Sequence, residues 1–189
     1  MQTQTITTYS FDELPVETQE QIADSWRNDD YFFWGDEWRD SLHKFADCFG
    51  LHVKDWCIDL YGQSYVEFEF EDDNYYKFYF GENNLATSEI GGVRLYKLII
   101  NNHFISKVIK KDCPFTGFCG DESLLKPIRD FIKQPCKHTS FYELIDECFD
   151  NWIKDYKVDL EYWHSFDCIK EEILANDYQF TANGDLFRK

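Results

Sequence analysis

The chain has 189 residues, enough for one domain with a sizeable core. Its 36 acidic and 19 basic side chains give a formal net charge of −17, so direct nucleic-acid binding is not expected, because such binding needs Lys and Arg to replace counterions. The N-terminus lacks the basic and apolar regions of a signal peptide, and no apolar stretch approaches the ~18 residues of a membrane span. We therefore expect a cytoplasmic protein with seven cysteine thiols, no membrane association and basic partners.

The N-terminal part predicts a short strand over residues 3–9 and then two helices. Ser10 stands three residues before Glu13, which is the spacing of a capping box, and the first helix is expected to run to about residue 28. The second helix is expected from about residue 34 to residue 49, where Gly50 is a natural stop. Its inward positions follow helical spacing: Trp34, Trp38, Leu42, Phe45 and Phe49.

Residues 51–80 predict a meander of three antiparallel strands. The first strand covers residues 51–61, with a bulge near Asp55, and the second covers residues 64–71, where apolar and acidic residues alternate. A turn then leads into a third strand over residues 75–80. The two N-terminal helices are expected to cover the apolar face of this sheet.

The rest of the chain predicts helices and a small hairpin. A helix over residues 92–109 is expected to break near Asn101 and Asn102, and Asp121 is expected to cap a helix that Pro127 bends or delays. Further helices follow from residue 140, and Asn183-Gly184 predicts a terminal hairpin. The predicted fold class is therefore α+β in a single domain over residues 1–189, with helices and meander in 1–80 and a mainly helical part in 85–189.

The acidic row on the second meander strand is the leading candidate for a working surface. It can be a solvated face that keeps the protein soluble, or a mimic of the phosphate backbone that occupies a basic groove. Acidic residues on and before the second helix can extend it, and tyrosines beside it can anchor a partner. The candidate partner-binding residues are Glu67, Glu69, Glu71, Asp72, Asp73, Tyr75, Asp36, Glu37 and Asp40.

Other constellations carry less information. Cys113, Cys119, Cys136 and His138 offer four soft ligands, but their spacings differ from those of familiar zinc fingers, so buried thiols and a zinc site both stay open. No nucleophile beside a base and no phosphate-binding loop is recognisable, so we expect neither an enzyme nor a cofactor or metal.

The segment from Arg94 to Lys111 is basic, although the chain as a whole is acidic. Its side chains, Arg94, Lys97, Lys107, Lys110 and Lys111, can pair with the protein's own acidic surface or form a second contact patch. The sequence leaves both interpretations open.

Two segments resemble a family of small acidic proteins encoded by bacteriophages and prophages, some of them labelled antitoxin-like. Residues 9–14, YSFDEL, are similar to that family's Y-x-F-x-E-L opening, and residues 175–181, ANDYQFT, are similar to its closing A-N-D-Y-x-F-T segment, which a hairpin with Asn183-Gly184 follows. The resemblance implies expression in the cytoplasm of a bacterial host cell and brings no catalytic residues.

Together these features predict an acidic, phage-type inhibitor that blocks a host nucleic-acid-directed defence protein, such as a CRISPR effector or a restriction enzyme. The expected partner is thus a basic, nucleic-acid-binding host protein. The alternatives are an antitoxin or regulatory subunit that masks a basic toxin, and a metal-dependent enzyme acting on nucleic acid.

Overall fold

The computed structural model describes residues 7–28, 32–70, 92–135 and 140–187. Helices and two small antiparallel sheets make up this structure, which confirms the predicted α+β class. The chain divides into two compact units: one comprises Met1–Phe32 and Asp159–Lys189, and the other comprises Phe33–Val158. The single domain expected over residues 1–189 stays a prediction, since each unit is described by itself.

The first unit joins the two ends of the chain. Its elements are β1 (Tyr9–Ser10), the 3₁₀ helix η1 (Phe11–Glu13), α1 (Val16–Arg27), α8 (Phe166–Ala175), β4 (Gln179–Phe180) and β5 (Leu186–Phe187). The strands form an antiparallel sheet in the order β1-β4-β5, with Tyr9 opposite Phe180. The predicted terminal hairpin is therefore confirmed, and it brings together the two segments that carry the family resemblance.

Aromatic and aliphatic side chains fill the core of this unit. The rings of Phe11 and Phe180 are fully buried and meet edge to face, with centroids 6.2 Å apart. Ser10 and Glu13 form the predicted capping box, in which the Ser10 amide donates to the Glu13 carboxylate at 2.8 Å. The box opens the short η1 and not the long helix expected after it, because α1 begins separately at Val16, after Pro15. This contact holds the pKa of Glu13 below its ordinary value.

The second unit packs helices and one hairpin around a ring-rich core. Its elements are α2 (Gly35–Phe49), β2 (Leu51–Cys57), β3 (Tyr65–Phe70), α4 (Gly92–Asn101), α5 (His103–Ile109), α6 (Cys119–Lys133) and α7 (Phe141–Trp163), of which α7 belongs to this unit as far as Val158. Helix α2 ends as predicted at Gly50, whose φ of 66° lies in the left-handed region that glycine favours. Asn102 separates α4 from α5 and caps α5 with its side chain, which confirms the predicted break.

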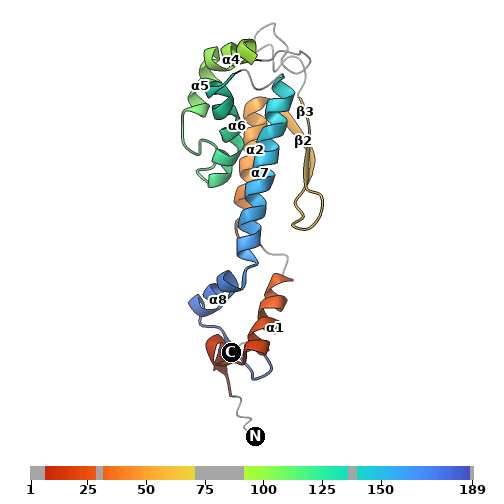
Figure 1. Ribbon diagram of the computed structural model, residues 1–189. Coiled ribbons are helices and arrows are strands. Elements are labelled where there is room, and N and C mark those ends of the chain that lie inside the picture. The colour runs from red at the N-terminus through yellow and green to blue at the C-terminus, as the bar shows by residue number, and fades with distance from the viewer. Residues whose placement is uncertain (1–6, 29–31, 71–91, 136–139, 188–189) are drawn as a thin grey trace. The chain divides into compact units, whose positions relative to one another are not determined.

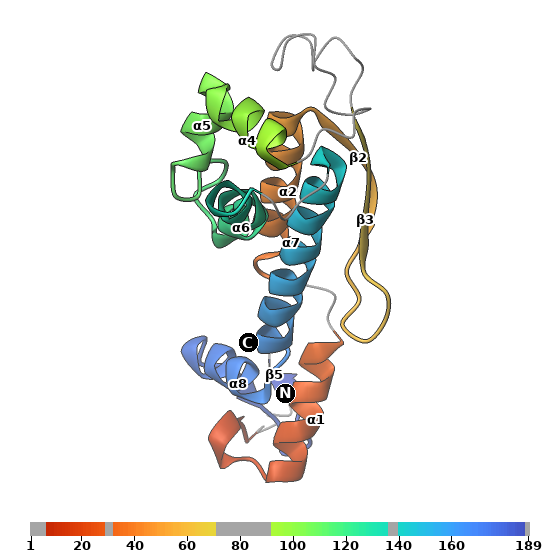
Figure 2. The same cartoon turned by 45° about the horizontal axis from the view of Figure 1, so that its top comes forward.

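The predicted meander needs a partial correction. Strands β2 and β3 pair antiparallel, with the predicted irregularity between Val53 and Asp55. They run beside α7 in Figure 1 and in Figure 2. The third expected strand, residues 75–80, lies outside the described residues. Of the two N-terminal helices, α2 packs on β2, whereas α1 packs on α8 in the first unit. The apolar side of α1 was therefore assigned to the wrong core, because helical periodicity indicates that one face of a helix is buried but does not indicate which element covers that face.

Helix α6 begins earlier than predicted and runs through its proline. Asp121 lies in its first turn with a fully buried carboxylate, which accepts hydrogen bonds from the amides of Phe115 and Thr116 at 2.8 Å each and thereby orders the preceding loop. Pro127 has no N–H to donate to the carbonyl of Ser123 four residues earlier. The side-chain amide of Asn151 on α7 donates to that carbonyl instead, at 2.8 Å, so α6 continues to Lys133.

Candidate protein-binding surface

The hairpin of β2 and β3 places Trp56 and Phe68 inward and its acidic side chains outward. Phe68 packs edge to face on Phe149 of α7 with ring centroids 5.0 Å apart, and Trp56 meets Trp152 of α7 at 5.8 Å. Glu67 and Glu69 are exposed, while the residues between and beside them are half-buried. The predicted alternation is therefore confirmed along β3, and the packed inner side fixes which side chains face solvent.

The register defines an outer face of this hairpin. It consists of His52, Lys54, Asp55, Cys57, Tyr65, Glu67 and Glu69. Asp55 stands directly opposite Glu67, and His52 stands opposite Glu69. Like charges directly opposite each other destabilise a sheet, so the pairing of Asp55 with Glu67 is not explained by the stability of the hairpin.

One cation and one tyrosine shape the electrostatics of the outer face. The Lys54 ammonium lies 2.6 Å from the Glu69 carboxylate, and this hydrogen bond raises the pKa of Lys54 and lowers the pKa of Glu69. The Tyr65 hydroxyl donates to Asp55 at 2.7 Å, which raises the pKa of that tyrosine. Lys54 therefore pairs with Glu69 and also attracts the Glu67 carboxylate. Asp55, which accepts from Tyr65, stands opposite Glu67 in the register.

The turn that joins the two strands presents a fully exposed aromatic ring. The Tyr61 side chain is 98% exposed, more than any other large hydrophobic residue of the described structure. The Asp59 carboxylate accepts from the amides of Tyr61 and Gly62, at 2.9 Å each, so the turn has a defined conformation. Sequence reasoning marked a turn at Gly62 but missed Asp59 and Tyr61, although an aspartate two residues before a Tyr-Gly pair is a usable turn signal.

The acidic residues of α2 do not join the outer face through any interaction among the described residues. Asp36 pairs with Arg39 at 3.0 Å, one helical turn away. Asp40 is exposed, whereas Glu37 is half-buried and its Oε2 atom is enclosed with no hydrogen-bond partner. The candidates Glu71, Asp72, Asp73 and Tyr75 lie outside the described residues. Of the nine predicted residues, the structure thus places Glu67 and Glu69 together on the outer face.

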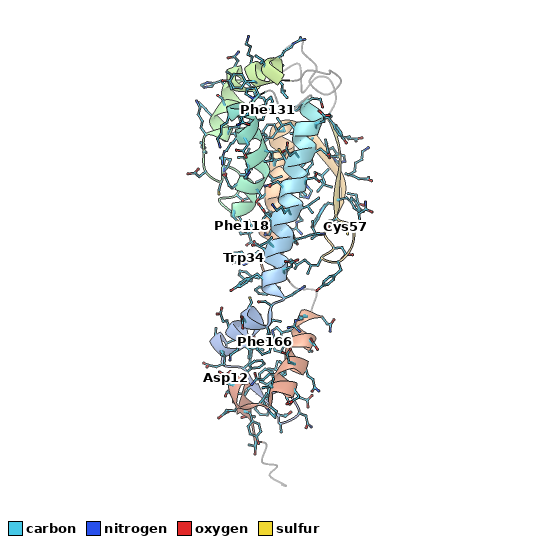
Figure 3. The ribbon with its side chains drawn as sticks, in the orientation of Figure 1. Asp12, Trp34, Cys57, Phe118, Phe131 and Phe166 are labelled. Carbon is cyan, nitrogen blue, oxygen red and sulfur yellow. The ribbon has the colours of Figure 1, made fainter. Side chains whose placement is uncertain are left out.

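An aromatic cluster lies at the start of α2, where the sequence predicted an inward side chain. Trp34 is 41% exposed and stacks on Phe118 with ring centroids 5.7 Å apart (Figure 3). Phe33 meets Trp34 edge to face at 4.6 Å. Phe118 in turn packs on the buried ring of Trp38. The helical period placed Trp34 in line with Trp38, but Trp34 precedes the first turn and is only partly covered.

No metal centre is formed by the part of the chain that the structure describes. No group of three or more His, Cys, Asp or Glu side chains there is arranged to hold an ion. Cys113 is half-buried and Cys119 is exposed, while Cys136 and His138 lie outside the described residues. Burial raises the pKa of Cys48 to about 12, so this thiol is a poor nucleophile.

Comparisons of the chain with protein-family models, with curated proteins and with solved structures found no match. None of the described helices combines the length and the apolar character needed to cross a membrane. The outer face of the hairpin combines three carboxylates with Tyr65, Lys54 and His52, on strands whose inner side packs on α7.

Proposed function

We propose that this chain is an acidic inhibitor of phage type, which binds a basic host protein that acts on nucleic acid, such as a CRISPR effector or a restriction enzyme. The outer face of the β2–β3 hairpin occupies the groove in which that protein holds phosphates. The chain acts by binding and carries out no reaction. Its site of action is the cytoplasm of the bacterial host.

The observation that carries this proposal is the placement of Asp55 directly opposite Glu67, with Glu69 following on the same strand. The pair is unfavourable for the isolated sheet. A partner that brings positive charge between the two carboxylates relieves this repulsion on binding, which gives electrostatic complementarity and a fast association rate. The inward aromatic contacts to α7 hold the carboxylates in place before the partner arrives.

Inhibition of DNA cleavage by purified enzymes tests the proposal. The probes are a guide-loaded CRISPR effector and a type II restriction endonuclease, each titrated with the chain, and plating of phage on hosts that carry these systems provides the matching assay in cells. We expect inhibition to weaken as salt rises, because exposed charges are screened. We also expect DNA to compete with the chain for the enzyme.

Charge-reversal variants test whether inhibition depends on the outer face or only on the overall negative charge of the chain. The double substitution Glu67→Lys with Glu69→Lys is expected to abolish inhibition. The control, Glu20→Lys with Glu161→Lys, changes the net charge equally at exposed positions of the first unit and should inhibit like the wild type. Equal activity of the two variants would remove the outer face from the mechanism, and a failure to inhibit any enzyme of either class would remove the proposed function.

A further inference from the structure

Helices α4 and α5 carry a group of lysines that is chemically unlike the rest of the protein. Residues 92–111 contain five basic and no acidic side chains, within a chain whose net charge is −17. Leu95 and Ile99 of α4 and Ile105 and Ile109 of α5 are buried. Lys97 lies on the opposite, exposed side of α4 and Lys107 on that of α5, while the exposed Lys110 and Lys111 follow the end of α5 at Ile109. Helix α4 contacts α5, and α5 contacts α6 (Figures 1 and 2). We call Lys97, Lys107, Lys110 and Lys111 the lysine surface.

Within the described residues, no carboxylate forms an ion pair with the lysine surface. Other lysines do form ion pairs: Lys126 and Lys133 both pair with Asp130, at 2.8 Å and 3.0 Å, and Lys170 pairs with Asp12 at 2.7 Å. Of the two interpretations that the sequence left open, internal pairing is therefore not supported for these four lysines.

A role in ending α5 does not explain these lysines either. Cationic side chains near a helix C-terminus often serve its last carbonyl groups. Here the Arg129 guanidinium of α6 takes that role, because it donates to the carbonyl of Ile109 at 2.9 Å and also to the carbonyl of Lys111. The same guanidinium pairs with Glu122. Arg129 thus fixes the end of α5, and the neighbouring ammonium groups are left to solvent.

We infer that the lysine surface binds the phosphate backbone of nucleic acid. Clustered cationic side chains are the usual means of replacing the counterions of a phosphate backbone, and the lysine surface offers four exposed ammonium groups within fifteen residues. The overall negative charge does not forbid such a contact, because charges beyond about 8 Å are largely screened at physiological salt. The inference is independent of the proposed function, since it concerns other residues and a different ligand.

Fluorescence anisotropy of a labelled DNA duplex, titrated with the full chain, tests the inference. Each phosphate contact contributes about −0.9 to the slope of log affinity against log salt, so four lysines predict a slope of about −3.6 and a loss of about twelvefold between 100 and 200 mM salt. Substituting Lys107, Lys110 and Lys111 by Gln should change the slope by about 2.7 toward zero. The control, Lys126→Gln with Lys133→Gln and Lys170→Gln, changes the net charge equally and should keep the wild-type slope.

Three results would overturn the inference. The first is that the wild type does not bind DNA at 100 mM salt, even at a protein concentration of roughly 10⁻³ M. This concentration exceeds the dissociation constants that are usual for non-specific DNA binding. The second is an equal loss in the two triple variants while circular dichroism shows both folded. The third is tighter binding to vesicles of anionic lipid or to polyglutamate than to DNA, which would assign the lysine surface to a membrane or to an acidic protein.

Discussion

The proline inside α6 makes the stability of the second unit depend on one side chain of α7. Asn151 supplies the hydrogen bond to the Ser123 carbonyl that residue 127 would otherwise donate. Ser123 is buried, so Asn151→Ala leaves this carbonyl without its donor in a place that water reaches poorly. We expect the substitution to lower the free energy of unfolding by about 1–3 kcal/mol, the typical effect of an unsatisfied buried acceptor.

A double-mutant cycle tests this explanation. In a Pro127→Ala background the new N–H can donate to the Ser123 carbonyl, so the loss caused by Asn151→Ala should shrink by about 1 kcal/mol. The four proteins are compared by urea unfolding followed through tryptophan fluorescence, with equal m-values as the condition for comparing midpoints. Asn28→Ala is the control, because the Asn28 side-chain amide also donates to a helix carbonyl, that of Asp24, but at an exposed position. Its effect on the free energy of unfolding should stay within about 0.5 kcal/mol. An Asn151→Ala effect that is the same in both backgrounds would refute the reasoning.

Two further substitutions address buried and crowded carboxylates. Asp121→Ala removes the acceptor of the loop amides of Phe115 and Thr116 and should lower the free energy of unfolding by about 2–4 kcal/mol in the same assay. Asp112 is exposed in the same loop, so Asp112→Ala should have little effect. Similar losses in the two variants would contradict the role assigned to Asp121. Asp146 is exposed on α7, and partial desolvation together with the neighbouring charge of Asp150 raises the pKa of its carboxyl group. Its charged form therefore opposes folding weakly, because solvent screens an exposed group, and this loss of stability grows as the pH rises through the raised pKa. Asp146→Asn should therefore raise the melting temperature at pH 7 but not at pH 3, and an equal change at the two pH values would contradict this sign.

Much of the fold was predictable because its signals are local. The end of α2 at Gly50, the break between α4 and α5 at Asn102 and the capping box at Ser10 each depend on a few consecutive residues. The outward direction of Glu67 and Glu69 follows in the same way from the period of a strand. Such features depend on the local backbone conformation, which a few consecutive residues are sufficient to determine.

The candidate site was only partly predictable, since its partners are distant in sequence. Asp55 faces Glu67 because the two strands pair in a particular register, and the irregularity at Val53 helps to set it. Tyr61 was overlooked because exposure is not a local property.

The sequence by itself determined the fold class, the terminal hairpin and the acidic outward row, because each depends on a periodic, capping or turn signal within a few consecutive residues. Only the tertiary structure decided which core each helix joins, since burial of α1 against α8 and of α2 against β2 requires contacts across many residues. It also decided that Glu69 is paired with Lys54, whereas the four lysines of α4, α5 and the residues after them have no such partner in the part of the chain that the structure describes. Charge counts cannot distinguish these cases, because an ion pair depends on the distance between two side chains and not on how many of each sign the chain contains.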